Sequence, residues 1–279
     1  MLKNFRLFNL GFFSLSLLIS ACSSNQGDKN GSKEVNSTLS YEVLQSFYNE
    51  PGNIGDIIEY DFELAHNGKI LTSTFEIPDY RERVMLRSAN FDADYMNVLT
   101  SLSVDDSVII KTKIESVPEE HLPPNLGVKQ GLLELTVAVR NIWNENNVLD
   151  EMVNQLSNNS PDSWTKTSRG VRIFWDEKGY GPKAEYGDSV RIHVKGLFPS
   201  GAAFMNTSTT EPKLPISFLL GEGLIQPLAW DDACSLTSQG DKITVLTPHD
   251  MAFGDKDRRP ILKYSILVFE IDVVEVIKN

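Results

Sequence analysis

Cysteine and histidine, the residues that most often carry nucleophilic and metal chemistry, are scarce in this sequence. It contains two cysteines, Cys22 and Cys234, and four histidines. No pair of these residues has the spacing of metal ligands, and no histidine has a spacing that suggests a base for Cys234. We therefore expect no metal and no cofactor, and we interpret Cys234 as a small buried apolar residue.

Aromatic and glycine-containing motifs in the second half of the chain point to a different chemistry. They follow one another between Ser168 and Val276. In chain order they are Ser168-Arg169-Gly170-Val171, Gly179-Tyr180-Gly181-Pro182, the run from Gly187 to Gly196, Phe218-Leu219-Leu220-Gly221, Leu224-Ile225, Trp230, Gly240-Asp241-Lys242, Pro248, Ala252-Phe253-Gly254 and the run from Ile266 to Ile271. Each motif is weak alone, but the ordered set resembles the FKBP family of peptidyl-prolyl cis-trans isomerases.

The resemblance implies a reaction that needs no acid, base or metal. Rotation about an X-Pro bond breaks no covalent bond, and its barrier of about 18–20 kcal/mol comes from amide resonance. A pocket can lower this barrier by holding the proline ring, desolvating the imide and favouring the twisted geometry. By the resemblance, the catalytic residues would be Phe204, Ile225, Trp230, Phe253 and Phe269, and the further substrate-binding residues would be Val194, Met205, Ile216, Phe218 and Leu224.

In this pocket Trp230 would form the floor, and the backbone N–H near Ile225 would bind a substrate carbonyl. Three positions depart from the family pattern. Val194 and Phe253 replace tyrosines, and Met205 replaces an aspartate for which Asn206 could partly substitute. Because each lost hydrogen bond typically costs about 0.5–1.5 kcal/mol, we expect weakened activity from a pocket that keeps its apolar walls. The alternative is that the same side chains form an ordinary core.

The elements that must position these residues occur twice in the sequence. A Gly-Asp turn precedes an alternating strand at residues 55–64 and again at 187–194. A short helical spacing follows from Tyr95 and from Trp230, and each block closes with an alternating strand, from Leu133 and from Leu267. This repeat predicts an α+β fold of two FKBP-like domains, each an antiparallel sheet wrapped around a short helix. A β-sandwich is less favoured, because the helical pattern recurs at the same place.

The first block follows the plan with fewer motifs. Phe62, Leu71, Thr72 and Tyr95 take the positions of the family's pocket tyrosine, phenylalanine, aspartate and tryptophan. The segment 119–127 resembles the loop that overhangs the family's pocket, although an ordinary Pro-rich turn explains it equally well. We expect a binding or spacer role here rather than catalysis.

The N-terminus has the pattern of a processing signal. Lys3 and Arg6 precede an apolar run that is too short to span a bilayer comfortably and ends in Ile19-Ser20-Ala21-Cys22. This ending resembles the lipobox of bacterial lipoproteins, in which Cys22 would be lipidated; the alternative is an uncleaved core helix. The resulting plan is a lipoprotein signal peptide at 1–21, a flexible tether at 22–38, a degenerate FKBP-like domain at 39–145, a linker at 146–163 and an isomerase domain at 164–279.

The charge balance argues against one class of partner. The formal net charge is −12, and an acidic surface repels the phosphate backbone of nucleic acids. The sequence thus predicts a prolyl isomerase that is lipid-anchored to the bacterial cell envelope, faces the periplasm or the exterior and acts on proline-containing protein clients. The alternatives are a non-catalytic chaperone and an envelope assembly lipoprotein built from degenerate FKBP folds.

Overall fold

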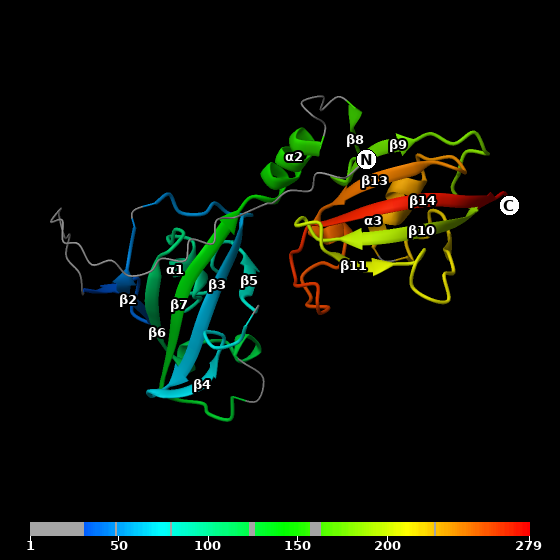
Figure 1. Cartoon of the computed structure of the whole chain (residues 1–279). Coiled ribbons are helices and arrows are strands. Elements are labelled where there is room, and N and C mark those ends of the chain that lie inside the picture. The colour runs from blue at the N-terminus through cyan, green and yellow to red at the C-terminus, as the bar shows by residue number, and fades with distance from the viewer. Residues whose placement is uncertain (1–30, 48, 79, 123–125, 157–162, 226) are drawn as a thin grey trace. The chain divides into compact units, whose positions relative to one another are not determined.

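The computed structural model describes residues 31–279 except 48, 79, 123–125, 157–162 and 226 (Figure 1). The predicted signal peptide and Cys22 therefore lie outside the described residues. The chain forms two compact units that meet in sequence between Asn144 and Glu145, and we call them the N-terminal unit and the C-terminal unit. Within the described ranges, no helix is long and apolar enough to cross a lipid bilayer.

The N-terminal unit contains one antiparallel sheet with the strand order β1-β2-β6-β7-β3-β4, and β5 also pairs with β3. Its strands are β1 (Ser32–Glu34), β2 (Leu39–Gln45), β3 (Ile57–His66), β4 (Lys69–Ser73), β5 (Glu82–Met85), β6 (Ser107–Lys113) and β7 (Leu132–Trp143). Its short helical elements are α1 (Met96–Leu99) and the 3-10 turns η1 (Ile114–Ser116) and η2 (Glu119–His121).

The C-terminal unit contains a second antiparallel sheet with the order β11-β10-β14-β13-β9-β8, and β12 also pairs with β10. Its strands are β8 (Thr165–Lys166), β9 (Arg172–Glu177), β10 (Ser189–Leu197), β11 (Ala203–Asn206), β12 (Ile216–Leu219), β13 (Lys242–Thr247) and β14 (Leu267–Ile277). Its helical elements are α2 (Glu145–Leu156), α3 (Leu228–Cys234) and the 3-10 turn η4 (His249–Met251).

The two sheets have the same topology. When the N-terminal sheet is read from β4 to β1, each strand corresponds to the strand at the same place in the C-terminal sheet, and β5 on β3 corresponds to β12 on β10. Each unit has one sheet rather than the two sheets of a sandwich. The predicted α+β repeat is therefore confirmed.

Equivalent turns show why the Gly-Asp motif recurs. Gly55 and Gly187 have φ angles of 93° and 96°, a conformation that glycine adopts without the steric cost of a side chain. The carboxylate of Asp56 or Asp188 then accepts a hydrogen bond from the backbone N–H three residues earlier, at 2.8 Å in both units. The turn therefore starts β3 and β10 in the same way.

One face of each sheet packs on its short helix. In the C-terminal unit, Ala229, Trp230 and Ala233 of α3 belong to the core that also contains residues of β10, β13 and β14. In the N-terminal unit, Met96, Val98 and Leu99 of α1 pack in the same way. Burying a large apolar side chain typically contributes about 1.5–3 kcal/mol, so these short helices are held by packing rather than by their own hydrogen bonds.

The opposite face of the C-terminal sheet is covered by α2. Leu149, Met152 and Val153 of this helix pack with Leu197, Leu246, Ile266 and Val268. The buried Arg172 of β9 forms an ion pair with Asp150 of α2 at 2.7 Å. All of α2 except Glu145 lies in the segment 146–163 that is predicted to be a linker, and the apolar face of this helix is part of the C-terminal unit.

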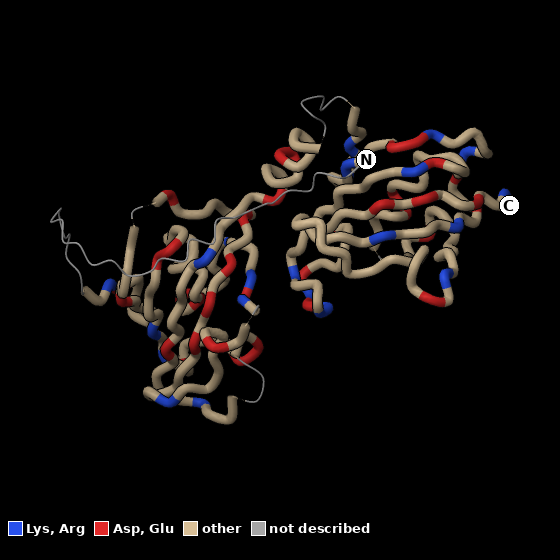
Figure 2. The backbone as a smooth tube through the Cα atoms, in the orientation of Figure 1, with Lys and Arg blue, Asp and Glu red and all other residues tan. Residues whose placement is uncertain are grey.

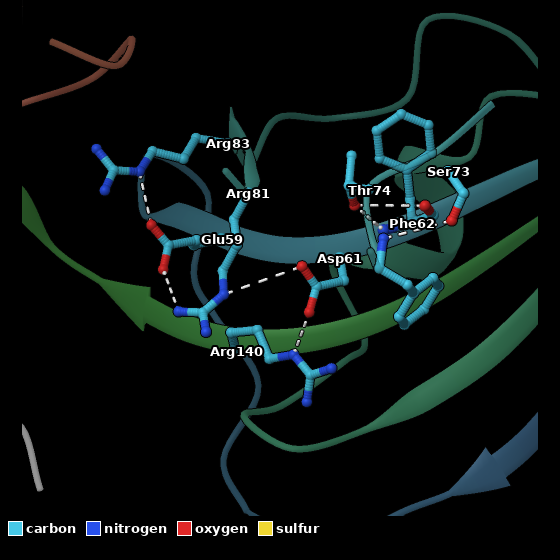
Figure 3. Close-up of polar contacts among 9 residues, drawn as sticks. Glu59, Asp61, Phe62, Ser73, Thr74, Arg81, Arg83 and Arg140 are labelled. Carbon is cyan, nitrogen blue, oxygen red and sulfur yellow. Dashed lines mark hydrogen bonds and ion pairs between the residues drawn. The ribbon is translucent and has the colours of Figure 1, made fainter. Parts of the chain in front are cut away.

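The opposite face of the N-terminal sheet instead carries ion pairs (Figure 3). On β3, Tyr60 and Phe62 belong to the core that packs on α1, so the alternating residues Glu59 and Asp61 face the other way. Arg83 contacts Glu59 at 2.7 Å, Arg140 contacts Asp61 at 2.6 Å, and Arg81 lies within 3.4 Å of Glu59 and 3.9 Å of Asp61. Here charged side chains occupy the face that an apolar helix covers in the C-terminal unit.

Candidate functional site

The structure brings nine of the ten predicted pocket residues into one cluster around the core of the C-terminal unit. Val194 comes from β10, Phe204 and Met205 from β11, Ile216 and Phe218 from β12, Trp230 from α3 and Phe269 from β14, and Ile225 and Phe253 come from connecting segments. Leu224 is the exception. Its side chain is 81% exposed and lies outside the cluster.

Three aromatic rings form the centre of this cluster. Phe269 is fully buried, and its ring meets Trp230 edge-to-face at 5.4 Å between centroids and Phe204 edge-to-face at 6.1 Å. Edge-to-face pairs add about 0.5–1.5 kcal/mol beyond the burial of their area. The rings are thus held at fixed angles by contacts among three elements of the fold, β11, α3 and β14.

Gly196 of β10 allows Phe204 to take this position. A Cβ atom at residue 196 would lie 2.5 Å from Cζ of Phe204, closer than Cβ atoms approach other heavy atoms in proteins. The ring therefore lies directly against the backbone of the neighbouring strand. This close approach explains the glycine that ends the run from Gly187 to Gly196.

Trp230 carries an unused hydrogen-bond donor. Its Nε1 atom is buried, and no acceptor lies within reach among the described residues. Most buried polar groups in proteins are hydrogen-bonded, and an unpaired one typically costs about 1–3 kcal/mol. The indole N–H of Trp230 is therefore a polar group that the described residues leave unpaired inside the core.

Two of the positions that lack the family's polar groups, Val194 and Phe253, have contacts that the structure describes. Val194 is buried, and its backbone N–H donates a hydrogen bond to Oγ1 of Thr207 at 2.8 Å. The equivalent contact in the N-terminal unit joins Thr74 to Phe62, also at 2.8 Å (Figure 3). The guanidinium of Arg258 lies 5.2 Å from the centre of the Phe253 ring.

Sequence reasoning missed two features of this region. Phe198 packs against Phe204 at 5.2 Å, but it follows the last residue of β10, where the alternating pattern ends. Glu145 and His249 are hydrogen-bonded. Asp250 lies near them, and one possible metal-ligand atom from each of the three residues lies within 4.8 Å of the other two. The partners are 104 residues apart in the chain, so no spacing motif could reveal them.

Cys234 is buried, as predicted from the sequence. Burial and, to a lesser extent, the charge of Asp231 raise the pKa of its thiol far above the ordinary range. A thiol that stays protonated is a poor nucleophile. The residue therefore contributes packing to the core of the C-terminal unit.

The N-terminal unit contains a cavity of about 440 Å³. Two of the four residues predicted at pocket positions, Phe62 and Tyr95, line it, whereas Leu71 and Thr72 are exposed and do not. His121 and Leu122, from the predicted overhanging loop, also line the cavity, and residues 123–125 of that loop lie outside the described residues. The N-terminal unit, which is predicted to be degenerate, thus has a mainly apolar cavity that is lined by Tyr95, its equivalent of Trp230.

Residues 181–274 match the family model of the FKBP-type peptidyl-prolyl cis-trans isomerases. The chain is 31% identical over 94 residues to FK506-binding protein 2 of Debaryomyces hansenii, covering 34% of this chain and 67% of that protein. It is 26% identical over 114 residues to the FKBP-type isomerase FkpA of Buchnera aphidicola, covering 41% of this chain and 45% of that protein. The crystal structure of FkpA from Escherichia coli aligns with 48% of this chain and 59% of that chain, at 24% identity and a TM-score of 0.40.

The family match covers the residues that build the aromatic cluster. The family match begins at the Gly181-Pro182 turn and ends within β14, so it includes Phe204, Trp230 and Phe269. With two α+β units of one topology and a family match across the second, this chain is a member of the FKBP-type peptidyl-prolyl cis-trans isomerase family.

Proposed function

We propose that the C-terminal unit catalyses cis-trans isomerisation of X-Pro bonds in protein clients outside the cytoplasm. The observation that carries this proposal is the edge-to-face arrangement of Phe204, Trp230 and Phe269 within the part of the chain that matches the family. The chain spans less than half the length of the FkpA relative from Buchnera, so its activity as a whole protein is inferred from the pocket residues and the family.

Each step of the reaction follows from apolar contact. The proline ring of the substrate packs against Trp230, and Phe204 and Phe253 limit its access to water. A desolvated imide loses the hydrogen bonds that water makes to its planar form, so the twisted geometry becomes less costly relative to the planar ground states.

The missing polar groups set the expected efficiency. Val194 and Phe253 offer no hydroxyl group to the substrate, and Met205 offers no carboxylate. Each absent hydrogen bond weakens binding by about 0.5–1.5 kcal/mol. We therefore propose a slow isomerase that depends on apolar burial more than on hydrogen bonding.

The proposed location is the cell envelope, with a lipid on Cys22 and a tether ahead of the N-terminal unit. This location is supported by the order of segments at the N-terminus: basic residues come first, an apolar run follows, and the run ends in Ile19-Ser20-Ala21-Cys22. Growth with a radiolabelled fatty acid should label the protein and the control variant Cys234→Ala, and it should not label Cys22→Ala. Label that remains in Cys22→Ala would contradict the proposed anchor.

The experiment that tests the activity uses residues 23–279 and a proline-containing tetrapeptide, whose cis-to-trans relaxation is followed by fluorescence. We expect an acceleration over the uncatalysed rate that grows linearly with protein concentration. No acceleration at high protein concentration, with the chain shown to be folded, would contradict the proposed function.

A further inference from the structure

The cavity in the N-terminal unit has the size and lining of a binding site that the proposed isomerase activity does not use. Its volume of about 440 Å³ is within the range of roughly 300–1,000 Å³ that is typical of ligand pockets. Apolar side chains such as Leu39, Phe62, Ile110 and Leu135 form most of its wall. The cavity lies between the sheet and the segments 86–95 and 117–122.

The buried carboxylate in the cavity wall is already satisfied. Asp94 accepts hydrogen bonds from Nη1 of Arg87 at 2.7 Å and from the backbone N–H groups of Asn90 and Met96 at 2.9 and 3.1 Å. Burial of Asp94 acts to raise its pKa, but these hydrogen bonds and the charge of Arg87 outweigh burial and lower the pKa. The carboxylate is therefore ionised and paired. Among the other lining residues, Glu82, Arg87, Thr112 and His121 are polar or charged, and most of the rest are apolar.

Three exposed acidic residues, Asp92, Glu119 and Glu120, are close sequence neighbours of residues that line the cavity, and we call them its border. The rings of Phe91 and His121 lie 4.9 Å apart, and both side chains line the cavity, with His121 exposed. The exposed Asp92 follows Phe91, and the exposed Glu119 and Glu120 precede His121. Acidic residues also predominate over the chain as a whole (Figure 2). An anionic border attracts basic ligands and repels fatty carboxylates and phosphates.

We propose that the N-terminal unit binds a large apolar side chain carried on an extended, basic stretch of an unfolded polypeptide, and that this stretch needs no proline. The cavity supplies the apolar contact, and the carboxylates of Asp92, Glu119 and Glu120 supply attraction for flanking lysine or arginine residues. The proposal goes beyond the isomerase activity, because it assigns a second site in a different unit.

Fluorescence anisotropy with residues 23–279 tests this site. The probe is a labelled, proline-free peptide with leucine and phenylalanine flanked by lysines, and the comparison peptides have glutamates in place of the lysines or serines in place of the apolar residues. We expect saturable binding of the first peptide, and binding at least about tenfold weaker for each of the other two. Equal affinity for all three peptides would overturn the proposal.

Two variants test whether the peptide binds in the cavity. Leu135→Trp fills the space from within, and Leu122→Asp introduces a charge at a half-buried lining position, where the fold is less at risk. Each variant should bind the lysine-flanked peptide with about tenfold lower affinity than the wild type. The control Trp230→Leu alters the aromatic cluster of the C-terminal unit and should leave this affinity unchanged. Unchanged binding in both cavity variants, or lost binding in Trp230→Leu, would overturn the proposal.

Charge reversal tests the border separately. The double variant Glu119→Lys with Glu120→Lys should bind the lysine-flanked peptide several-fold more weakly than the wild type at low salt. The difference should be smaller at high salt, because salt screens the interaction between exposed charges. Glu151→Lys on α2 is the matched control and should have no effect. Isomerase activity towards a prolyl tetrapeptide, measured on the same variants, keeps a failure of this site distinct from a failure of the proposed function.

Discussion

The carboxylate of Glu145 accepts hydrogen bonds from both the backbone N–H and the ring Nδ1 of His249, at 2.7 and 2.9 Å. Glu145 is the first residue of α2, and His249 begins the turn that leads to Phe253. The carbonyl oxygen of His249 in turn accepts hydrogen bonds from the N–H groups of Ala252 and Gly254, on either side of Phe253. One ion pair thus joins the helix before the C-terminal sheet to the base of the segment that carries Phe253.

Glu145→Gln should destabilise the protein more at low pH than at high pH. Burial acts to lower the pKa of His249, but Glu145, with smaller contributions from the charges of Asp250 and Asp255, outweighs burial and raises the pKa above 6.5. A raised folded-state pKa contributes stability that is complete below the unfolded-state pKa and is lost as pH rises through the folded-state pKa. We expect a loss of about 1–2 kcal/mol at about pH 5.5 and a smaller loss at about pH 8.5.

Denaturant unfolding at the two pH values measures this difference, and an NMR titration of His249 should show a lower pKa in Glu145→Gln. The neighbouring variant Asn146→Asp is unsuitable as a control, because Asn146 contacts Arg172. Glu151→Gln, elsewhere on α2, is a matched control. A loss of stability that is equal at both pH values would contradict the ion pair.

Asp94→Asn should destabilise the N-terminal unit, with the opposite dependence on pH. The folded-state pKa of Asp94 is lowered, so its contribution is present above the unfolded-state pKa near 3.8 and is lost as pH falls through the folded-state pKa. At neutral pH we expect a loss of about 1.5–3 kcal/mol, as for hydrogen bonds to a charged group. Thermal unfolding from neutral to acidic pH measures it, with the exposed Asp92→Asn as control. A difference from wild type that grows towards acidic pH would contradict this account.

Gly196→Ala should reduce activity by displacing Phe204. The new methyl group would lie 2.5 Å from the Phe204 ring, so the ring or the strand must move. We expect a loss of about 1–3 kcal/mol of stability, as is typical of overpacking, together with a lower kcat/KM for prolyl peptides. Gly31→Ala, where a Cβ would meet nothing within 4 Å, is the control. Full activity in Gly196→Ala would show that Phe204 has no part in the pocket.

The repeated plan could be predicted because its signals are local. A positive-φ glycine followed by a turn-capping aspartate, as at Gly55-Asp56, and alternation along a strand both leave their pattern in consecutive residues. Alternation also placed Phe269 on a strand, whereas Phe204 was assigned by the family resemblance. The strands that carry them, β14 and β11, flank β10 on its two sides. Leu224 was assigned to the pocket from a short motif and not from an alternating or helical pattern. It lies outside the strands and helices, and no such element holds its side chain against the core.

Other features depend on contacts between distant residues. Helix α2 fully buries only Leu149, Met152 and Val153, and seven of its twelve residues are polar, so its sequence resembles a connection between domains. The cavity of the N-terminal unit depends on how the segments 86–95 and 117–122 stand away from the sheet. Phe62 and Tyr95 could be assigned to it by the repeat, but the empty volume could not, because volume follows from the packing of all its walls.

The central claim is tested most directly by comparing Trp230→Leu with Tyr95→Leu in the prolyl peptide assay on residues 23–279. The two residues occupy equivalent places in the two units, one packed edge-to-face on Phe269 and the other lining the cavity. We predict that kcat/KM falls by about tenfold or more in Trp230→Leu and stays at the wild-type value in Tyr95→Leu. Equal activity in Trp230→Leu and wild type, with both proteins folded, would contradict the account.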